Sequence, residues 1–161
     1  MNKPDSLRAA LVAANPDFAI DADRLKVWID DGRVVARRTR ALGFEYRYQL
    51  QILAEACTSG PDALMVPILL WLREHQPDLL LRFQKDEGAI RFAADILDDS
   101  SWTIAIVLEL SEAVTVTARA DGSGWDVAHL PEPSPDDPLL AGARQDVPLA
   151  ELAAGGRRVL P

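Results

Sequence analysis

The feature that most constrains the fold is an apolar segment, residues 63–72, which has no polar side and ends in a polar stop that begins at Arg73. A helix on a protein surface shows one apolar stripe, whereas a helix that is apolar all round must be covered all round. The single sheet expected in a chain of 161 residues covers only part of such a helix. We therefore expect its outward side, which includes Leu69 and Leu70, to contact another element or another copy of the chain.

Alternating patterns before and after this segment predict strands. The clearest lies at residues 44–54, where every second residue is apolar and the residues between them, including Glu45, Arg47 and Gln49, are polar. A helix would scatter these residues around its axis. With a first helix at residues 4–14, the pattern predicts an α+β fold: a mostly antiparallel sheet packed by two main helices.

Three turns are expected between these elements. Asp31-Gly32 predicts a tight hairpin turn that joins a strand at residues 24–31 to one at residues 33–40. Ser111-Glu112 is expected to separate two further strands, and residues 121–124 to form the next turn.

The composition changes at Pro131, because six of the eleven prolines lie between this residue and the end of the chain. We expect a domain over residues 1–130 and an extended proline-rich arm over residues 131–161. The arm ends in a predicted small hairpin, which is only marginally stable alone and must dock on something. Its apolar residues are the candidate contacts: Leu149, Leu152 and Val159.

The net charge of −8 argues against a dedicated nucleic-acid binder, since phosphate contacts need a basic face. One basic cluster stands out in this acidic chain, and it consists of Arg33, Arg37, Arg38 and Arg40. The alternatives are a solvated strand face, an ion-pair surface between subunits and, last, a DNA contact.

The sequence offers no arrangement typical of an active site. A single cysteine, Cys57, excludes an internal disulfide and is interpreted as a small buried residue. Neither His75 nor His129 has a partner at metal-ligand spacing, and the aspartates of residues 95–99 lack the pattern of a calcium loop. We therefore expect no catalytic residue, no metal and no cofactor.

The longest apolar run, residues 63–72, is too short to span a bilayer, and the first residues lack a secretory signal pattern. We expect a soluble protein that is made without export.

Several short blocks occur in an order and at spacings that are found together in one protein family. They are Lys3–Arg8, Phe44–Tyr48, Leu64–Asp78, Phe92–Ile96 and Asp98–Ser101. Over roughly residues 3–130 the chain resembles the tail completion protein R (GpR) family of contractile-tailed temperate phages of the Peduovirus type. The last 31 residues resemble the family less well, and only Glu151-Leu152 and a following turn fit its expected ending.

The resemblance implies a structural virion protein that completes or terminates the phage tail and allows head–tail joining. It implies a ring, a hexamer, at the head-proximal end of the tube and sheath, with DNA passing through the lumen and no membrane. The implied partners are other copies of the chain, the tube and sheath proteins and the head–neck connector. The implied location is the virion tail, after assembly in the host cytoplasm.

The sequence is also compatible with two other functions. A head-side connector or stopper protein looks similar from sequence, and a cytosolic small-ligand-binding or enzyme domain is the less favoured alternative.

Overall fold

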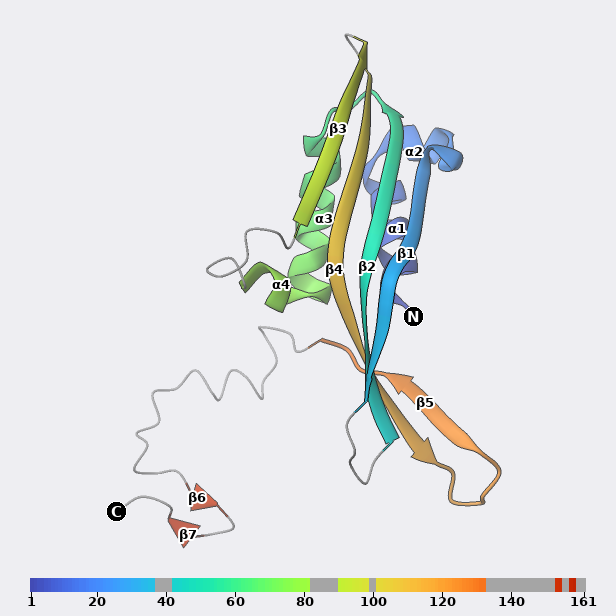
Figure 1. The fold of residues 1–161 in the computed structure, drawn as a ribbon, viewed down its shortest axis with the longest axis vertical. Coiled ribbons are helices and arrows are strands. Elements are labelled where there is room, and N and C mark those ends of the chain that lie inside the picture. The colour runs from blue at the N-terminus through green and yellow to red at the C-terminus, as the bar shows by residue number, and fades with distance from the viewer. Residues whose placement is uncertain (37–41, 82–89, 99–100, 133–152, 155–156, 159–161) are drawn as a thin grey trace.

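An antiparallel sheet forms the frame of the structure, a computed structural model that describes residues 1–36, 42–81, 90–98, 101–132, 153–154 and 157–158 (Figure 1). Its path runs β1-β2-β4-β3, and each neighbouring pair is antiparallel. The fifth strand, β5, pairs with the half of β4 that lies beyond the end of β3. The strands are β1 (Leu25–Ala36), β2 (Leu42–Cys57), β3 (Ile90–Asp98), β4 (Ser101–Ala118) and β5 (Trp125–His129).

Near the end of the chain, β6 (Ala153–Ala154) pairs antiparallel with β7 (Arg157–Arg158). The hairpin predicted there is therefore confirmed in its pairing.

Two main helices, α1 (Lys3–Ala14) and α3 (Asp62–His75), pack against the sheet, which confirms the predicted α+β fold. Two short helices that the sequence did not predict follow them, α2 (Pro16–Ile20) and α4 (Pro77–Leu81). Each begins at a proline that is separated by one residue from the end of the preceding helix. Proline suits the first position of a helix, where its missing N–H is not needed, so the same residue ends one helix and starts the next.

The core lies between the helices and one face of the sheet. The strict alternation of β2 places Leu50 and Ile52 on this face, opposite Leu108 and Ile106 of β4, and all four side chains are buried. Helix residues spaced by four positions close the core from the other side, because such residues share one helix face. They are Leu7 and Leu11 of α1, and Leu64, Ile68 and Leu72 of α3.

The hairpin predicted at Asp31-Gly32 is wrong. β1 continues through this dipeptide and stays paired with β2 on both sides of it, with a shift in register between Asp30 and Arg33. Asp31 has a φ of 48°, which is the left-handed conformation that a tight turn also uses. The dipeptide forms a β-bulge, which strengthens the local twist without reversing the chain.

The break predicted at Ser111-Glu112 is also wrong, because β4 runs without interruption from Ser101 to Ala118. Ser111 lies opposite Arg47, and Glu112 lies opposite Tyr46. The polar pair looked like a turn because a charged residue interrupts the apolar alternation there, but the structure buries that charge. The turn predicted at residues 121–124 does lie between β4 and β5.

The sheet extends beyond the helices that cover it. In Figure 1 the β4–β5 hairpin and the first residues of β2 project past the end of α1, and none of the helices in the described residues lies against them.

Candidate interaction surfaces

The outward side of α3 is apolar and exposed, as the sequence predicts. Val66, Leu69 and Leu70 form this side, which we call the α3 outer face, and Leu70 is 62% exposed. The helix runs from Asp62 to His75 with Pro67 inside it. The opposite side of the helix is buried in the core by Leu64, Ile68, Trp71 and Leu72.

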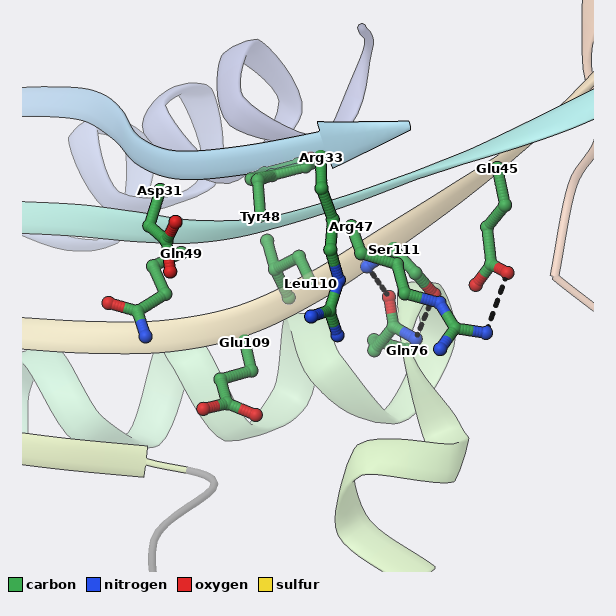
Figure 2. A pocket seen from close by; sticks show the side chains of 10 residues that line it. All are labelled: Asp31, Arg33, Glu45, Arg47, Tyr48, Gln49, Gln76, Glu109, Leu110 and Ser111. Carbon is green, nitrogen blue, oxygen red and sulfur yellow. Dashed lines mark hydrogen bonds and ion pairs between the residues drawn. The ribbon is translucent and has the colours of Figure 1, made fainter. Parts of the chain in front are cut away.

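A second surface, the polar pocket, lies on the face of the sheet that points away from the helix core. Figure 2 shows Arg33 of β1 and Arg47 and Gln49 of β2 among the residues that line it. Glu45 lies at one end, where Oε2 accepts a hydrogen bond from Nη2 of Arg47 at 2.9 Å. This hydrogen bond and the charge of Glu45 raise the pKa of the Arg47 guanidinium.

The pocket brings together four of the predicted contact residues from two strands: Arg33, Glu45, Arg47 and Gln49. It also includes two acids that sequence reasoning missed, Asp31 and Glu109. Since positive and negative groups are mixed, this surface suits contacts that set register and orientation with another protein. It does not have the uniformly basic character that phosphate binding requires. The other predicted arginines, Arg37, Arg38 and Arg40, lie outside the described residues.

A buried carboxylate marks the place where the helix layer ends. Glu112 is 4% exposed, and its carboxylate accepts hydrogen bonds from Oη of Tyr48 at 2.6 Å and from the amide of Asn2 at 2.8 Å. Nδ1 of His129 lies 3.1 Å from Glu112 Oε2, which is within ion-pair distance but outside hydrogen-bond geometry.

The hydrogen bonds outweigh burial in deciding the charge of Glu112. Burial alone would raise the pKa of this carboxyl, but the bonds from Tyr48 and from the amides of Asn2 and Lys3 bring the pKa below its ordinary value. Burial, and then the hydrogen bond to Glu112, raise the pKa of Tyr48. The site is therefore a carboxylate beside a protonated phenol, which is a structural pair.

A lysine network lies beside this carboxylate. Nζ of Lys3 donates hydrogen bonds to Gln76 Oε1 at 2.6 Å, to the Ser111 carbonyl at 2.7 Å and to Glu132 Oε1 at 2.6 Å. The Ser111 amide in turn donates to Gln76 Oε1 at 3.2 Å. β3 pairs with β4 only as far as Leu108, and the pairing of β4 with β5 starts only at Val114. Gln76 and Lys3 therefore satisfy the strand edge that neither β3 nor β5 reaches.

Sequence reasoning missed these network residues, although one signal was available. Glu112 occupies an apolar-facing position in the alternation from Ile104 to Val116, so its burial was predictable. Nothing in the sequence links Lys3 to Gln76 or Glu132, which lie 73 and 129 residues away.

The residues considered for chemistry have structural roles. Burial, and then the charge of Asp17, raise the pKa of the Cys57 thiol, which opposes nucleophilic reactivity. His75 stacks on Trp71 with ring centroids 4.6 Å apart, and its Nδ1 lies 3.0 Å from the Trp71 carbonyl oxygen. Within the described part of the chain, no three His, Cys, Asp or Glu residues are grouped so that they could hold a metal.

The described helices include none that is long and apolar enough to cross a membrane. The predicted arm contacts, Leu149, Leu152 and Val159, lie outside the described residues.

Comparisons with known proteins agree with one another. The family model for P2 phage tail completion protein R (GpR) matches residues 1–133. Tail completion protein R of Escherichia phage P2 is 38% identical to the chain over 139 residues, which are 86% of this chain and 88% of that protein. No solved structure matches the chain significantly.

Proposed function

This chain belongs to the P2 phage tail completion protein R (GpR) family, whose members are structural tail proteins and not enzymes, and from that premise we propose that it closes the finished tail as a ring. The ring is a hexamer at the head-proximal end of the tube and sheath. There it stops further subunit addition and presents a different surface to the head–neck connector. DNA passes through its lumen, and assembly takes place in the host cytoplasm.

The observation that carries this proposal is the α3 outer face. Three apolar side chains of one helix, Val66, Leu69 and Leu70, are 41–62% exposed on the described part of the chain. Scattered exposed leucines are ordinary, but a contiguous apolar surface on a soluble protein marks an interaction site. A ring joins each copy to two neighbours through two different surfaces, and this helix face supplies one of them.

The polar pocket supplies a second kind of contact. Its mixed charges, from Arg33, Arg47 and Glu45, suit a partner of fixed orientation such as the tube, the sheath or the connector. The arginines at residues 37–40 extend the same strand segment in sequence, and we include them in this contact.

In this proposal residues 1–130 form the tail-completion domain, residues 131–161 form the C-terminal arm, and residues 139–161 of the arm pack on a neighbouring subunit or tail protein. The chain leaves that domain at a fixed point, because Glu132 is paired with Lys3 at 2.6 Å. Truncation after Glu132 retains this pair and is expected to leave a cooperative thermal transition while weakening the ring or the tail joint. Loss of the cooperative transition would show that the arm belongs to the core.

The direct test removes the protein from an infection by a phage that encodes it. We expect tails of abnormal length, or complete tails that cannot join heads, while filled heads accumulate. Loss of DNA packaging with normal, head-competent tails would instead place the protein on the head side, as a connector or stopper.

A matched pair of variants connects this phenotype to α3. Leu70→Asp places a charge on the outer face and should fail to complement, because an unpaired charge at an interface is costly. Glu74→Gln, an exposed polar position on the same helix, should complement fully.

A further inference from the structure

The helix-free end of the sheet carries an apolar surface that the proposed function has not used. Four side chains form it, each 58–61% exposed: Val34 of β1, Leu42 of β2, and Trp125 and Val127 of β5. We call this set the hairpin strip. The other side of the same strands carries small and polar residues, including Thr115, Thr117 and Asp126.

The hairpin strip continues the face that the helices cover. Residues directly opposite each other in an antiparallel pair share a face, and Leu42, Val116 and Val127 are opposite one another across β2, β4 and β5. Even-numbered residues of β2 from Leu42 to Ala54 point the same way, because side chains alternate along a strand. From Tyr48 to Ala54 this face is buried in the core, whereas at Leu42 it is exposed.

A mostly apolar pocket lies where the covered face becomes the uncovered one. Its lining includes Met1, Ile29, Val34 and Tyr46. Pockets of this kind hold the anchor side chains that dominate binding energy at protein interfaces. The hairpin strip therefore begins at this pocket, which includes Val34, and runs outward along the hairpin to Trp125.

We propose that the hairpin strip and this pocket bind the α3 outer face of a second copy of the chain. The inference rests on the proposed ring and names the two surfaces that meet in it. Within one copy, α1 and α3 cover one end of this sheet face. The other end of the face is covered by α3 of the neighbouring copy. Since the two surfaces differ, the contact is heterologous, and each copy has one of each to offer its two neighbours.

The apolar areas are sufficient for such a contact. A Val or Leu side chain carries roughly 60–120 Å² of apolar surface, and a tryptophan roughly 150–250 Å². With these four residues about 60% exposed, the hairpin strip presents on the order of 300 Å². About 57% of the area of a specific interface is apolar. An apolar area of about 300 Å² therefore implies a total interface area of roughly 500 Å² on each partner. The resulting total, about 1,000 Å², reaches the minimum size of a biological interface.

Two single substitutions test the pairing. Val127→Asp damages the hairpin strip, and Leu70→Asp damages the α3 outer face. Both positions are exposed, so neither should unfold the chain, which circular dichroism and thermal melting will check. Each variant should raise the midpoint concentration of self-association, measured by analytical ultracentrifugation of the full chain, by at least about tenfold. Ala128→Asp is the matched control, because this exposed neighbour of Val127 points to the opposite face, and it should assemble like wild type.

Mixing the two variants provides the decisive measurement. The intact α3 of Val127→Asp can bind the intact hairpin strip of Leu70→Asp, but the two remaining surfaces are both damaged. The mixture should therefore stop at a 1:1 dimer, while each variant alone stays monomeric.

Three results would overturn the inference. If Val127→Asp assembles like wild type, the strip is not an interface, although a ring built on another surface would still stand. If the Leu70→Asp variant still forms dimers and the Val127→Asp variant does not, the hairpin strips of two copies bind each other. A wild-type chain that stays monomeric at millimolar concentration would exclude self-association through either surface.

Discussion

The buried carboxylate of Glu112 offers the sharpest test of how this fold is held together. Glu112→Gln keeps the shape of the side chain and removes its charge. In the wild type, two donors, the Tyr48 hydroxyl and the Asn2 amide, point at a buried carboxylate. A hydrogen bond to a charged group contributes about 1.5–3 kcal/mol and a neutral one about 0.5–1.5 kcal/mol. Glutamine has one acceptor oxygen, which can take the Asn2 amide, and its NH2 group can then donate to the Tyr48 hydroxyl, so both bonds become neutral. This change should lower the free energy of unfolding by roughly 2–3 kcal/mol.

Urea denaturation of the monomer at neutral pH measures this difference, with Glu109→Gln as control. Glu109 lies on the same strand but is exposed, so its substitution should change the free energy of unfolding by less than about 0.5 kcal/mol. Tyr48→Phe removes one of the two donors, and a double-mutant cycle with Glu112→Gln should return a coupling energy of about 1–2 kcal/mol.

The pH dependence of the same measurement has a definite sign. The pKa of Glu112 is lowered in the folded state from its ordinary value of 4.5. The carboxylate therefore contributes stability that is fully present above about pH 4.5 and is lost as the pH falls through the lower, folded-state pKa. The difference in free energy of unfolding between wild type and Glu112→Gln should become smaller in that acidic range. A difference below about 0.5 kcal/mol at neutral pH, or one that grows on acidification, would show that the charge of Glu112 does not stabilise the fold.

Two further predictions concern other buried groups. Lys3→Met removes the three hydrogen bonds of the Lys3 ammonium and should lower the free energy of unfolding by about 2–3 kcal/mol; Lys26→Met, which breaks an exposed pair with Glu55, should lower it by less than about 1 kcal/mol. Equal losses in the two variants, measured by urea denaturation, would show that the Lys3 network contributes no more than a surface ion pair. The Cys57 thiol is buried, and its pKa is raised by burial and by the charge of Asp17. Labelling of this thiol requires local opening of the fold. It should therefore react with a thiol reagent at least about 100-fold more slowly in the native protein than in urea. Native labelling at the rate of the unfolded chain would contradict the buried position of Cys57.

Local pattern was enough to predict most of the elements and the outer face of α3. Alternation over residues 44–54 identifies a half-buried strand, because a period of two is incompatible with a helix. The apolar character of residues 63–72 on every side predicted an exposed apolar face, and Leu69 and Leu70 do lie on it. These conclusions follow from side-chain periodicity, which depends only on neighbours in the chain.

Local pattern failed where a short polar segment could be either a turn or a special position within a strand. Asp31-Gly32 has turn chemistry, yet the pairing of β1 with β2 on both sides of it makes it a bulge. Ser111-Glu112 interrupts an apolar alternation, yet Tyr48 and the start of α1 supply partners that allow β4 to bury the charge. In both cases the decision was made by residues far away in sequence.

The remaining features were decided by the tertiary structure alone. Only the fold brings Lys3 to Gln76, Ser111 and Glu132, because the edge of β4 needs partners between the end of β3 and the start of β5. The hairpin strip arises because β4 is longer than the helices that cover it, so one continuous apolar face is part core and part surface. A sequence specifies which side of a strand is apolar, but what covers that side depends on where the helices end.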